Sequence, residues 1–172
     1  MESNGLLAEL TRRFGAALTD VSEEPGTIRA TVARESLLGV CRFCRTHEEA
    51  QCDYLACLCG VDAGEAIQVV YHLYSLPREH MVILRAAAPK EDCWLDSVTA
   101  IWKAANWHER ETAEMLGVTF RDHPNPRHLL LPDGWKGHPL RKDYVPEPDY
   151  TRPDELPEGA WEEFRRRVDS EY

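Results

Sequence analysis

The sequence predicts an α+β fold: helices on one face of a mostly antiparallel sheet, followed by a long extended proline-rich C-terminal segment. Two patterns predict the folded part. Apolar residues recur at helical spacing near the start and in the middle of the chain, and three apolar segments between these regions are joined by short turns. The 172 residues, 43% of them hydrophobic, are enough to bury one core.

Four segments have the composition of strands. They are 27–33, 54–61, 66–76 and 81–88. In the third segment Ile67, Val69 and Tyr71 alternate with side chains expected on the opposite face. The last three segments are separated by only a few residues, and connections this short join antiparallel neighbours. We therefore expect an antiparallel meander.

Three segments have the apolar spacing of helices. They are 5–18, 35–50 and 97–116. In the last of them Ser97 is expected to cap the first turn. Asn106 followed by Glu109 resembles a second capping pair, so two short helices jointed near 104–106 are expected. Gly117 is expected to end the second of them.

The C-terminal part differs in composition from the rest of the chain. Eight of the eleven prolines lie after residue 123, and proline interrupts both helices and sheets. Residues 1–122 are therefore expected to form the α+β domain. Residues 123–172 are expected to form an extended docking segment and an acidic tail, with one short helix at 157–168. From residue 146 onward the tail holds nine acidic and four basic residues.

The overall composition excludes several classes of protein. A formal net charge of −10 and a pI near 5.2 argue against nucleic acid as a partner, because phosphate binding needs a basic surface. The N-terminal residues lack the basic and apolar regions of a secretory signal, and no apolar run approaches the length of a membrane span. We expect a protein on the cytoplasmic side of the membrane, with cysteines present as thiols or ligands rather than disulfides.

Five cysteines lie within nineteen residues: Cys41, Cys44, Cys52, Cys57 and Cys59. Thiolates at this density can hold zinc or an iron–sulfur cluster. Alternatively each cysteine fills an apolar site, because free cysteine is among the most buried residue types. Their positions on an expected helix and an expected strand favour packing, and a thiol-rich metal-binding protein is the remote alternative.

The common signatures of nucleotide-binding enzymes and serine hydrolases are absent from the sequence. The segment 108–112, HERET, resembles the zinc-protease motif, but Thr112 stands where that motif requires its second histidine. A soluble enzyme that uses His108 and Glu111 as acid and base is the weakest alternative, because no flanking motif supports it.

Charged residues are concentrated in this same segment. Arg110 lies between Glu109 and Glu111 and follows Trp107 closely. An ordered ion-pair network and an ordinary solvated helix face are both open interpretations of this arrangement. Glu114 is expected to be solvated.

Two longer stretches resemble a known family. They are SVTAIWKAANWHERETAEMLGVTF and HPNPRHLLLPDGWKGHPLRKDY. Both are similar to the 30 kDa subunit, also called the C subunit, of proton-translocating NADH:quinone oxidoreductase (respiratory complex I), and the resemblance covers roughly residues 27–146. The matching residues are Trp107, Glu109, Arg110, Glu111, Gly117, His123, Pro124, Leu130, Leu131, Pro132, Trp135, Gly137 and the run from His138 to Tyr144. The departures from the family pattern are Glu114 for aspartate, Asp122 for glycine, Pro126 for leucine and His128 for arginine.

The resemblance implies a small α+β subunit of the peripheral arm that carries neither a cofactor nor a catalytic residue. FMN and iron–sulfur clusters would belong to partner subunits, and NADH and quinone would be substrates of the whole complex. The implied partners are the D subunit, near the quinone site, and neighbouring iron–sulfur subunits at the cytoplasmic face of the cell (inner) membrane. The alternative assembly is a membrane-bound nickel–iron hydrogenase or another energy-converting dehydrogenase complex with an equivalent subunit.

Residues 134–150 combine prolines, basic residues and aromatic side chains, which indicates a docking segment, and the resemblance implies that this segment docks on the D subunit. A proline-stiffened segment loses less entropy on docking than a flexible one, and Trp135 and Tyr144 supply amphipathic anchors. Together with the helix around Arg110, this segment contains the expected partner contacts. They are Trp107, Glu109, Arg110, Glu111, His123, Trp135, His138, Arg141, Lys142, Asp143 and Tyr144.

Overall fold

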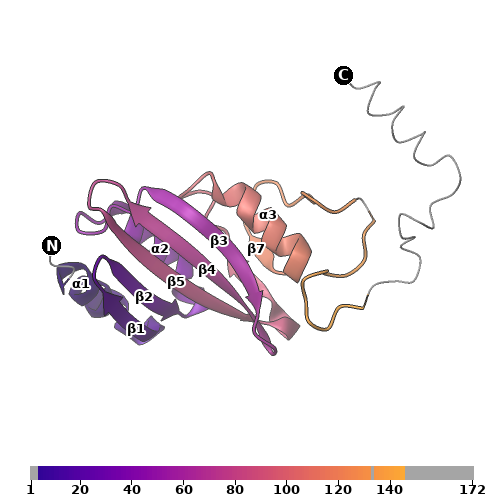
Figure 1. Ribbon diagram of the computed structural model, residues 1–172, viewed down its shortest axis with the longest axis horizontal. Coiled ribbons are helices and arrows are strands. Elements are labelled where there is room, and N and C mark those ends of the chain that lie inside the picture. Colours follow the sequence, from indigo (N-terminus) through magenta and orange to yellow (C-terminus); the bar gives the residue numbers. More distant parts are fainter. Residues whose placement is uncertain (1–3, 133, 146–172) are drawn as a thin grey trace, which may run out of the picture.

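The computed structural model describes residues 4–132 and 134–145 (Figure 1). Its helices are α1 (Asn4–Phe14), α2 (Leu37–Thr46) and α3 (Ala105–Leu116), with the short 3-10 helices η1 (Gly15–Ala17), η2 (Arg34–Ser36) and η3 (Lys90–Asp92). The main sheet contains β1 (Leu18–Glu24), β2 (Thr27–Val32), β3 (Tyr54–Asp62), β4 (Ala66–Ser75) and β5 (His80–Pro89). A separate parallel pair contains β6 (Trp94–Asp96) and β7 (Thr119–Arg121). The predicted α+β class is confirmed.

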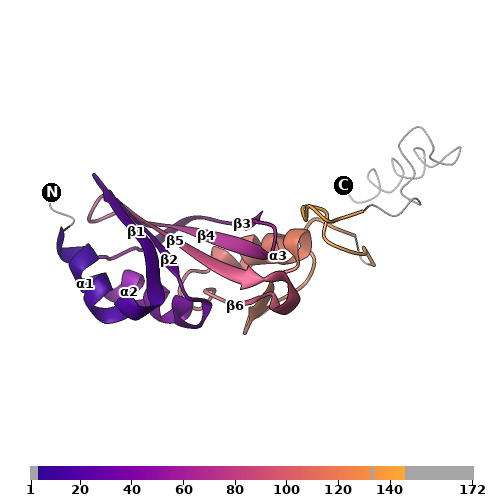
Figure 2. The same ribbon diagram turned by 90° about the horizontal axis from the view of Figure 1, so that it is seen from below.

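The main sheet has the strand order β1-β2-β5-β4-β3. The predicted meander is confirmed, because β3, β4 and β5 pair antiparallel, while β2 pairs with β5 in parallel. Figure 2 shows α1 and α2 on one face of this sheet. α3 packs on the same face at β3, where a Cβ added to Gly60 would overlap Thr112 and Leu116. The helices therefore cover one face, as predicted.

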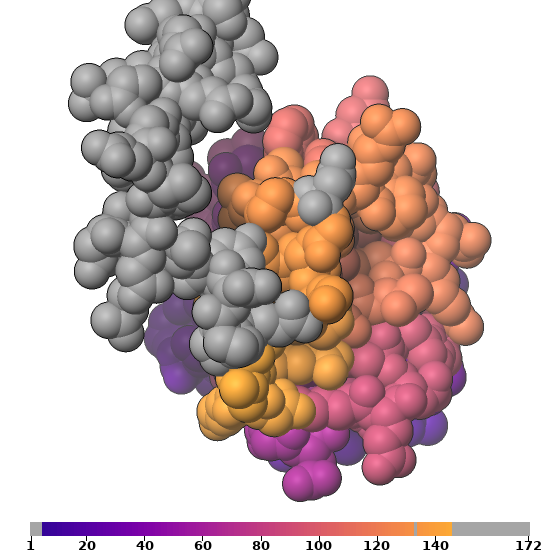
Figure 3. All heavy atoms as spheres, turned by 90° about the vertical axis from the view of Figure 1, so that its right-hand side faces the viewer, coloured from indigo at the N-terminus to yellow at the C-terminus, as the bar shows by residue number. Residues whose placement is uncertain are grey.

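The described residues of 123–145, which we call the strap, contain neither a helix nor a strand. They pass over the end of the molecule formed by α3, and this end faces the viewer in Figure 3. The described part of the C-terminal segment is therefore irregular, which agrees with its many prolines. The expected helix at 157–168 and the acidic tail lie outside the described residues.

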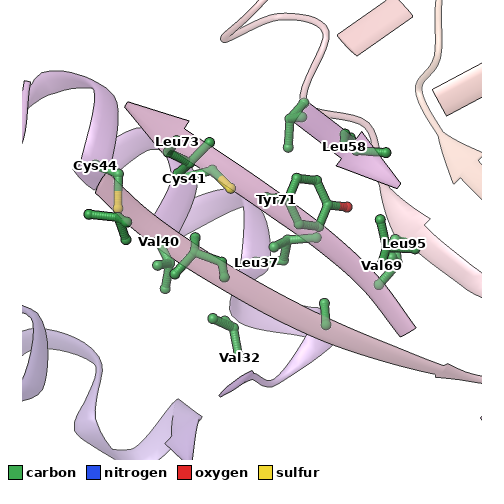
Figure 4. Packing of buried hydrophobic residues seen from close by; sticks show 14 of the residues in the cluster. Val32, Leu37, Val40, Cys41, Cys44, Leu58, Val69, Tyr71, Leu73 and Leu95 are labelled. Atoms are coloured by element: carbon green, nitrogen blue, oxygen red, sulfur yellow. The ribbon is translucent and has the colours of Figure 1, made fainter. Parts of the chain in front are cut away.

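The core lies between the sheet and α2. β4 alternates strictly between buried and half-buried residues, and its inward side chains from Ile67 to Leu73 are fully buried. Leu37 of α2 lies beside Tyr71 of β4, and Cys41 of α2 lies beside Leu73 (Figure 4). Each fully buried aliphatic side chain of this kind contributes about 1.5–3 kcal/mol to stability.

The expected pair of short helices in the centre of the chain is wrong. Residues 97–104 form turns, and α3 is the one helix that follows them in the described part of the chain. The hydroxyl of Ser97 accepts the N–H of Thr99 at 3.2 Å, which closes a local turn rather than capping a helix. The carboxylate of Glu109 accepts the N–H of Val98 at 2.7 Å instead of capping α3. Both expected caps are therefore replaced by contacts of this turn.

β1, β6 and β7 are the strands that the sequence pattern did not predict, and β1 is the longest of them. Only Leu18 of this strand is buried, and a bulge between Thr19 and Ser22 interrupts its pairing with β2. Because β1 is an exposed edge strand, its sequence lacks the apolar alternation that marks a buried strand. The helix expected at 5–18 ends earlier for this reason. Within the described residues, no helix has the length and apolar character needed to cross a membrane.

Candidate functional site

The strap returns to the C-terminal end of α3. A helix leaves its last four carbonyl groups without partners inside the helix. Here each carbonyl from residue 113 to residue 117 accepts a hydrogen bond. The pairs are Gly117 N–H to Ala113 O (2.8 Å), His138 Nδ1 to Glu114 O (2.9 Å), Leu140 N–H to Met115 O (3.0 Å), Arg141 Nε to Leu116 O (2.7 Å) and Arg141 Nη2 to Gly117 O (3.4 Å).

Two of these donors have electrostatic consequences. A carbonyl only accepts hydrogen bonds, so the Nδ1 of His138 must carry a proton. The guanidinium of Arg141 places a positive charge at the negative end of the helix dipole. These two residues of the strap therefore stabilise α3 within the same chain.

Gly117 ends α3, as predicted, in the left-handed conformation with φ 75°. A side chain is strained in this conformation. In addition, a Cβ at this position would lie 2.5 Å from Arg141 Nη2 and 2.6 Å from the ring of His138. Glycine is therefore required here both for the turn and for the approach of the strap.

We expect Gly117→Ala to lower the free energy of unfolding by about 1–3 kcal/mol through backbone strain and to displace the strap in addition. Gly26→Ala is the matched control, because Gly26 has φ 74° and a Cβ added there would meet nothing within 4 Å. Denaturant unfolding of both variants measures the difference. An equal decrease in the free energy of unfolding of the two variants would show that contact with the strap adds nothing to the cost of a side chain at position 117.

A second anchor ties the strap to the sheet. Asp62, at the end of β3, accepts hydrogen bonds from Lys90 Nζ (2.9 Å), Lys142 N–H (2.8 Å) and Gly64 N–H (2.9 Å). Lys90 and these backbone donors hold the pKa of Asp62 well below its ordinary value. Asp143 also pairs with Lys90, at 3.4 Å. The residues that follow Arg141 are thus fixed against the β3–β4 turn and the end of β5.

Glu114 holds the middle of the strap, and the expectation that it is solvated is wrong. Its exposed fraction is 4%. Its carboxylate accepts the N–H groups of Leu129 (2.9 Å), Leu130 (2.8 Å) and Leu131 (3.3 Å). One buried side chain therefore organises three consecutive residues of the strap.

Arg110 holds the beginning of the strap. Its Nε donates to the carbonyl of Arg127 at 2.8 Å and its Nη2 to the carbonyl of His128 at 2.7 Å. The guanidinium also lies 5.3 Å from the ring centre of Trp107. Within the described residues, the ion-pair network considered for Arg110 and its neighbouring glutamates does not form. The planar fork binds two backbone carbonyls instead.

Glu109 is fully buried, and burial raises its pKa to about 7. Its Oε2 makes no hydrogen bond within the described residues and lies 3.9 Å from the Nε2 of His123. The Nδ1 of His123 accepts the N–H of Asn125 at 3.0 Å, so in the neutral ring Nε2 carries the proton. That Nε2 donates to the carbonyl of Asn106 at 3.2 Å. Both ring nitrogens of a neutral His123 are therefore satisfied.

A cavity of about 240 Å³ lies between α3 and the strap. Its lining includes Glu109, Arg110, Glu114, His123, His128 and His138. Most of its charged side chains bind backbone groups of the strap or of the turn at Val98, so this arrangement is suited to fixing these segments against α3. His108 and Glu111, the alternative acid–base pair, do not belong to the described lining.

The five clustered cysteines are divided between the two faces of the sheet. Cys41, Cys44 and Cys52 are buried in the core, where burial raises the pKa of each thiol, that of Cys52 to about 12. Cys57 and Cys59 lie on the outer face of β3. In the described part of the chain, no group of three or more His, Cys, Asp or Glu residues is arranged to hold a metal ion.

Exposed apolar side chains mark the surface of α3 and the strap. Trp107 is 61% exposed, Leu130 and Leu140 are each 62% exposed, and Val145 is 81% exposed. The sequence analysis named Trp107 as an expected partner contact, whereas Leu130 and Leu140 were named only as matches to the family pattern. Nothing in a segment without periodicity distinguishes an exposed leucine from a buried one, so no pattern in the sequence predicted the exposure of these leucines or of Val145.

The structure gathers the expected contact residues at the α3 end of the molecule, with different exposures. Trp107, Glu111, Lys142 and Asp143 are exposed, and Glu109 is fully buried. The half-buried residues are Arg110, His123, Trp135, His138, Arg141 and Tyr144. Several of the half-buried residues, such as Arg110, His138 and Arg141, therefore form hydrogen bonds with the strap or with α3 of their own chain.

A family model described as the 30 kDa subunit of respiratory-chain NADH dehydrogenase matches residues 30–150. The chain belongs to this family. Relatives of the 30 kDa subunit family include the C subunit of NADH-quinone oxidoreductase from Geobacter sulfurreducens, 40% identical over 147 residues, and that from Geobacter metallireducens, 37% identical over 150 residues. Each alignment covers 83% of this chain and 90% of the relative.

Two solved structures are similar to this chain. A trypsin-resistant fragment of Nqo5 is 26% identical, with a TM-score of 0.59 over 70% of this chain and 97% of that one. A chain of the membrane-bound sulfane sulfur reductase, an archaeal respiratory membrane complex, has a TM-score of 0.64. It is 15% identical, covering 84% of this chain and 86% of that one, and this similarity shows the fold alone.

Proposed function

We propose that this chain is the 30 kDa (C) subunit of a proton-translocating NADH:quinone oxidoreductase and acts there as a non-catalytic interaction subunit of the peripheral arm. It binds the D subunit near the quinone site and neighbouring iron–sulfur subunits, at the cytoplasmic face of the membrane. FMN and the iron–sulfur clusters belong to those partners. The family match and the names of the relatives support this assignment.

The observation that carries the docking role is an apolar surface on a fixed backbone. Trp107, Leu130 and Leu140 are exposed, while Glu114 and Arg141 bind the backbone beneath them. A surface that is ordered before binding loses less conformational entropy when a partner covers it. Aromatic and apolar side chains of this kind form the energetic centre of many interfaces.

The residues of this surface divide into two groups by what they do. Trp107, Leu130 and Leu140 contact the partner directly. Glu114 and Arg141 position the strap. Glu109 is fully buried, so it cannot touch a partner and instead holds the turn at Val98 in place.

Leu140→Asp is expected to reduce recovery of partner subunits about tenfold or more, because a charge would enter an apolar interface. Leu76→Asp is the matched control, since Leu76 is also 62% exposed but lies in the β4–β5 turn. The tagged full chain is purified from native membranes in mild detergent, and the co-purifying subunits are quantified by mass spectrometry. If Leu140→Asp recovered partners as well as Leu76→Asp, docking through the strap would be wrong.

The same experiment separates the alternative assemblies. Co-purification of flavin, iron–sulfur and quinone-site subunits supports the proposed complex. A nickel–iron large subunit in their place would assign the chain to a hydrogenase-type assembly. Recovery of the unaltered chain without partners would contradict the interaction role.

A further inference from the structure

Two thiols lie side by side on the outer face of the sheet. Cys57 and Cys59 occupy alternate positions of β3, and the buried Leu58 between them points into the core. Because side chains at alternate positions of a strand point to the same face, the two thiol groups lie on the same side of the sheet. Cys59 is exposed and Cys57 is half-buried, so solvent reaches this pair.

The other four cysteines do not offer such a pair. Three of them are sealed in the core, and the fourth, Cys93, is half-buried with its thiol beside the guanidinium of Arg141. Of the six cysteines in the chain, only Cys57 and Cys59 present neighbouring sulfur atoms to solvent.

One further group makes the surroundings of this pair favourable for a cation. His72 is the β4 partner of Cys57, and residues opposite each other in an antiparallel pair share a face. Its Nδ1 is shielded from solvent and makes no hydrogen bond within the described residues. A nitrogen without a hydrogen-bond partner in the described part of the chain therefore lies on the same face of the sheet as the two sulfurs.

Strand geometry favours a bridging ion over a disulfide. Cys57 and Cys59 pair with consecutive alternate residues of β4 without a bulge between them, so their Cα atoms are about 6.6 Å apart. This is close to the upper limit of about 6.8 Å for disulfides. An ion bound between two sulfurs tolerates the wider spacing.

We propose that Cys57 and Cys59 bind one Cu(I) ion as two thiolates, on the face of the sheet that also carries His72. Soft thiolate ligands select Cu(I), which accepts two-coordinate sites, whereas zinc sites in proteins are almost always four-coordinate. Each thiol loses one proton to solvent and forms one Cu–S bond. The ion keeps its oxidation state, two protons are released, and no oxidant or reductant is consumed.

The test is a Cu(I) titration of the reduced, purified full chain under anaerobic conditions, in competition with a colorimetric Cu(I) chelator. We expect one Cu(I) per chain, and native mass spectrometry should show the addition of one copper with the loss of two protons. Cys57→Ser and Cys59→Ser should each weaken binding about a hundredfold or more, because losing a direct ligand costs at least as much as losing an outer partner.

Cys93→Ser is the matched control and should bind Cu(I) as the unaltered chain does. Far-UV circular dichroism of each serine variant checks that it is folded. Unchanged affinity in either Cys57→Ser or Cys59→Ser would overturn the proposal, as would displacement of Cu(I) by an equal concentration of Zn(II).

Discussion

Glu109→Gln is expected to make the chain more stable than the unaltered protein at pH 8 and to leave its stability nearly unchanged at pH 4. Glutamine keeps an oxygen that can accept the N–H of Val98, the contact that Glu109 makes at 2.7 Å. Unlike glutamate, it cannot ionise inside the core. The variant therefore separates the charge of Glu109 from its hydrogen bond.

The direction of this change in stability with pH follows from the pKa of Glu109. Burial raises that pKa to about 7 in the folded chain, whereas an unfolded glutamate titrates at about 4.3. Below the pKa of the unfolded chain, Glu109 is protonated in both the folded and the unfolded state, and the contribution of the protonated side chain to stability is fully present. As the pH rises from about 4 to about 7, only the unfolded state releases its proton, so stability falls and the contribution is lost. The full difference corresponds to about 4 kcal/mol.

Denaturant unfolding at a series of pH values measures this effect. Glu111→Gln is the control, because Glu111 lies on the same helix and is exposed. That variant should follow the unaltered chain at every pH. If Glu109→Gln showed the same fall in stability between about pH 4 and about pH 7, the charge of Glu109 would not be its source.

Glu114→Ala is expected to release the strap from α3. Three backbone N–H groups, those of residues 129–131, lose their acceptor. Hydrogen bonds to a charged group contribute about 1.5–3 kcal/mol each, but the freed groups can turn to water at the surface. We therefore expect a loss of about 3 kcal/mol rather than the sum, together with faster trypsin cleavage after Arg127.

Urea unfolding and limited proteolysis measure the two effects separately. Glu111→Ala, a change at an exposed position of the same helix, should alter stability by no more than about 0.5 kcal/mol. Cleavage after Arg127 that stays as slow as in the unaltered chain would show that other contacts hold the strap.

The regular elements were predictable because their patterns depend on near neighbours in the sequence. Strict alternation along β4 follows from one buried face, and Tyr71 and Leu73 lie where the alternation predicts. β1 could not be found in this way, because an edge strand with one buried residue has no alternation to detect. The turns at 97–104 replaced an expected helix because a carboxylate eleven residues away binds Val98.

The roles of the charged residues depended on distant partners and were less predictable. Glu109 and Glu114 are acids on one helix, and the sequence is equally compatible with a solvated position for either of them. Only the fold shows that Glu114 binds backbone groups fifteen to seventeen residues away. The family resemblance identified His138 and Arg141 as important, but it could not show that they bind the last carbonyls of α3.

The hydrogen bond between Arg141 and the carbonyl of Leu116 also bears on the order in which parts of the chain fold during synthesis. Twenty-five residues separate the two, and a ribosome adding about 5–20 residues per second needs roughly one to five seconds to make them. A helix relaxes in about a microsecond, so α3 forms and melts many times while its last carbonyls are still open to water. A nascent chain can therefore complete its sheet before the end of α3 is fixed, because the contacts of Arg141 wait until that residue has emerged.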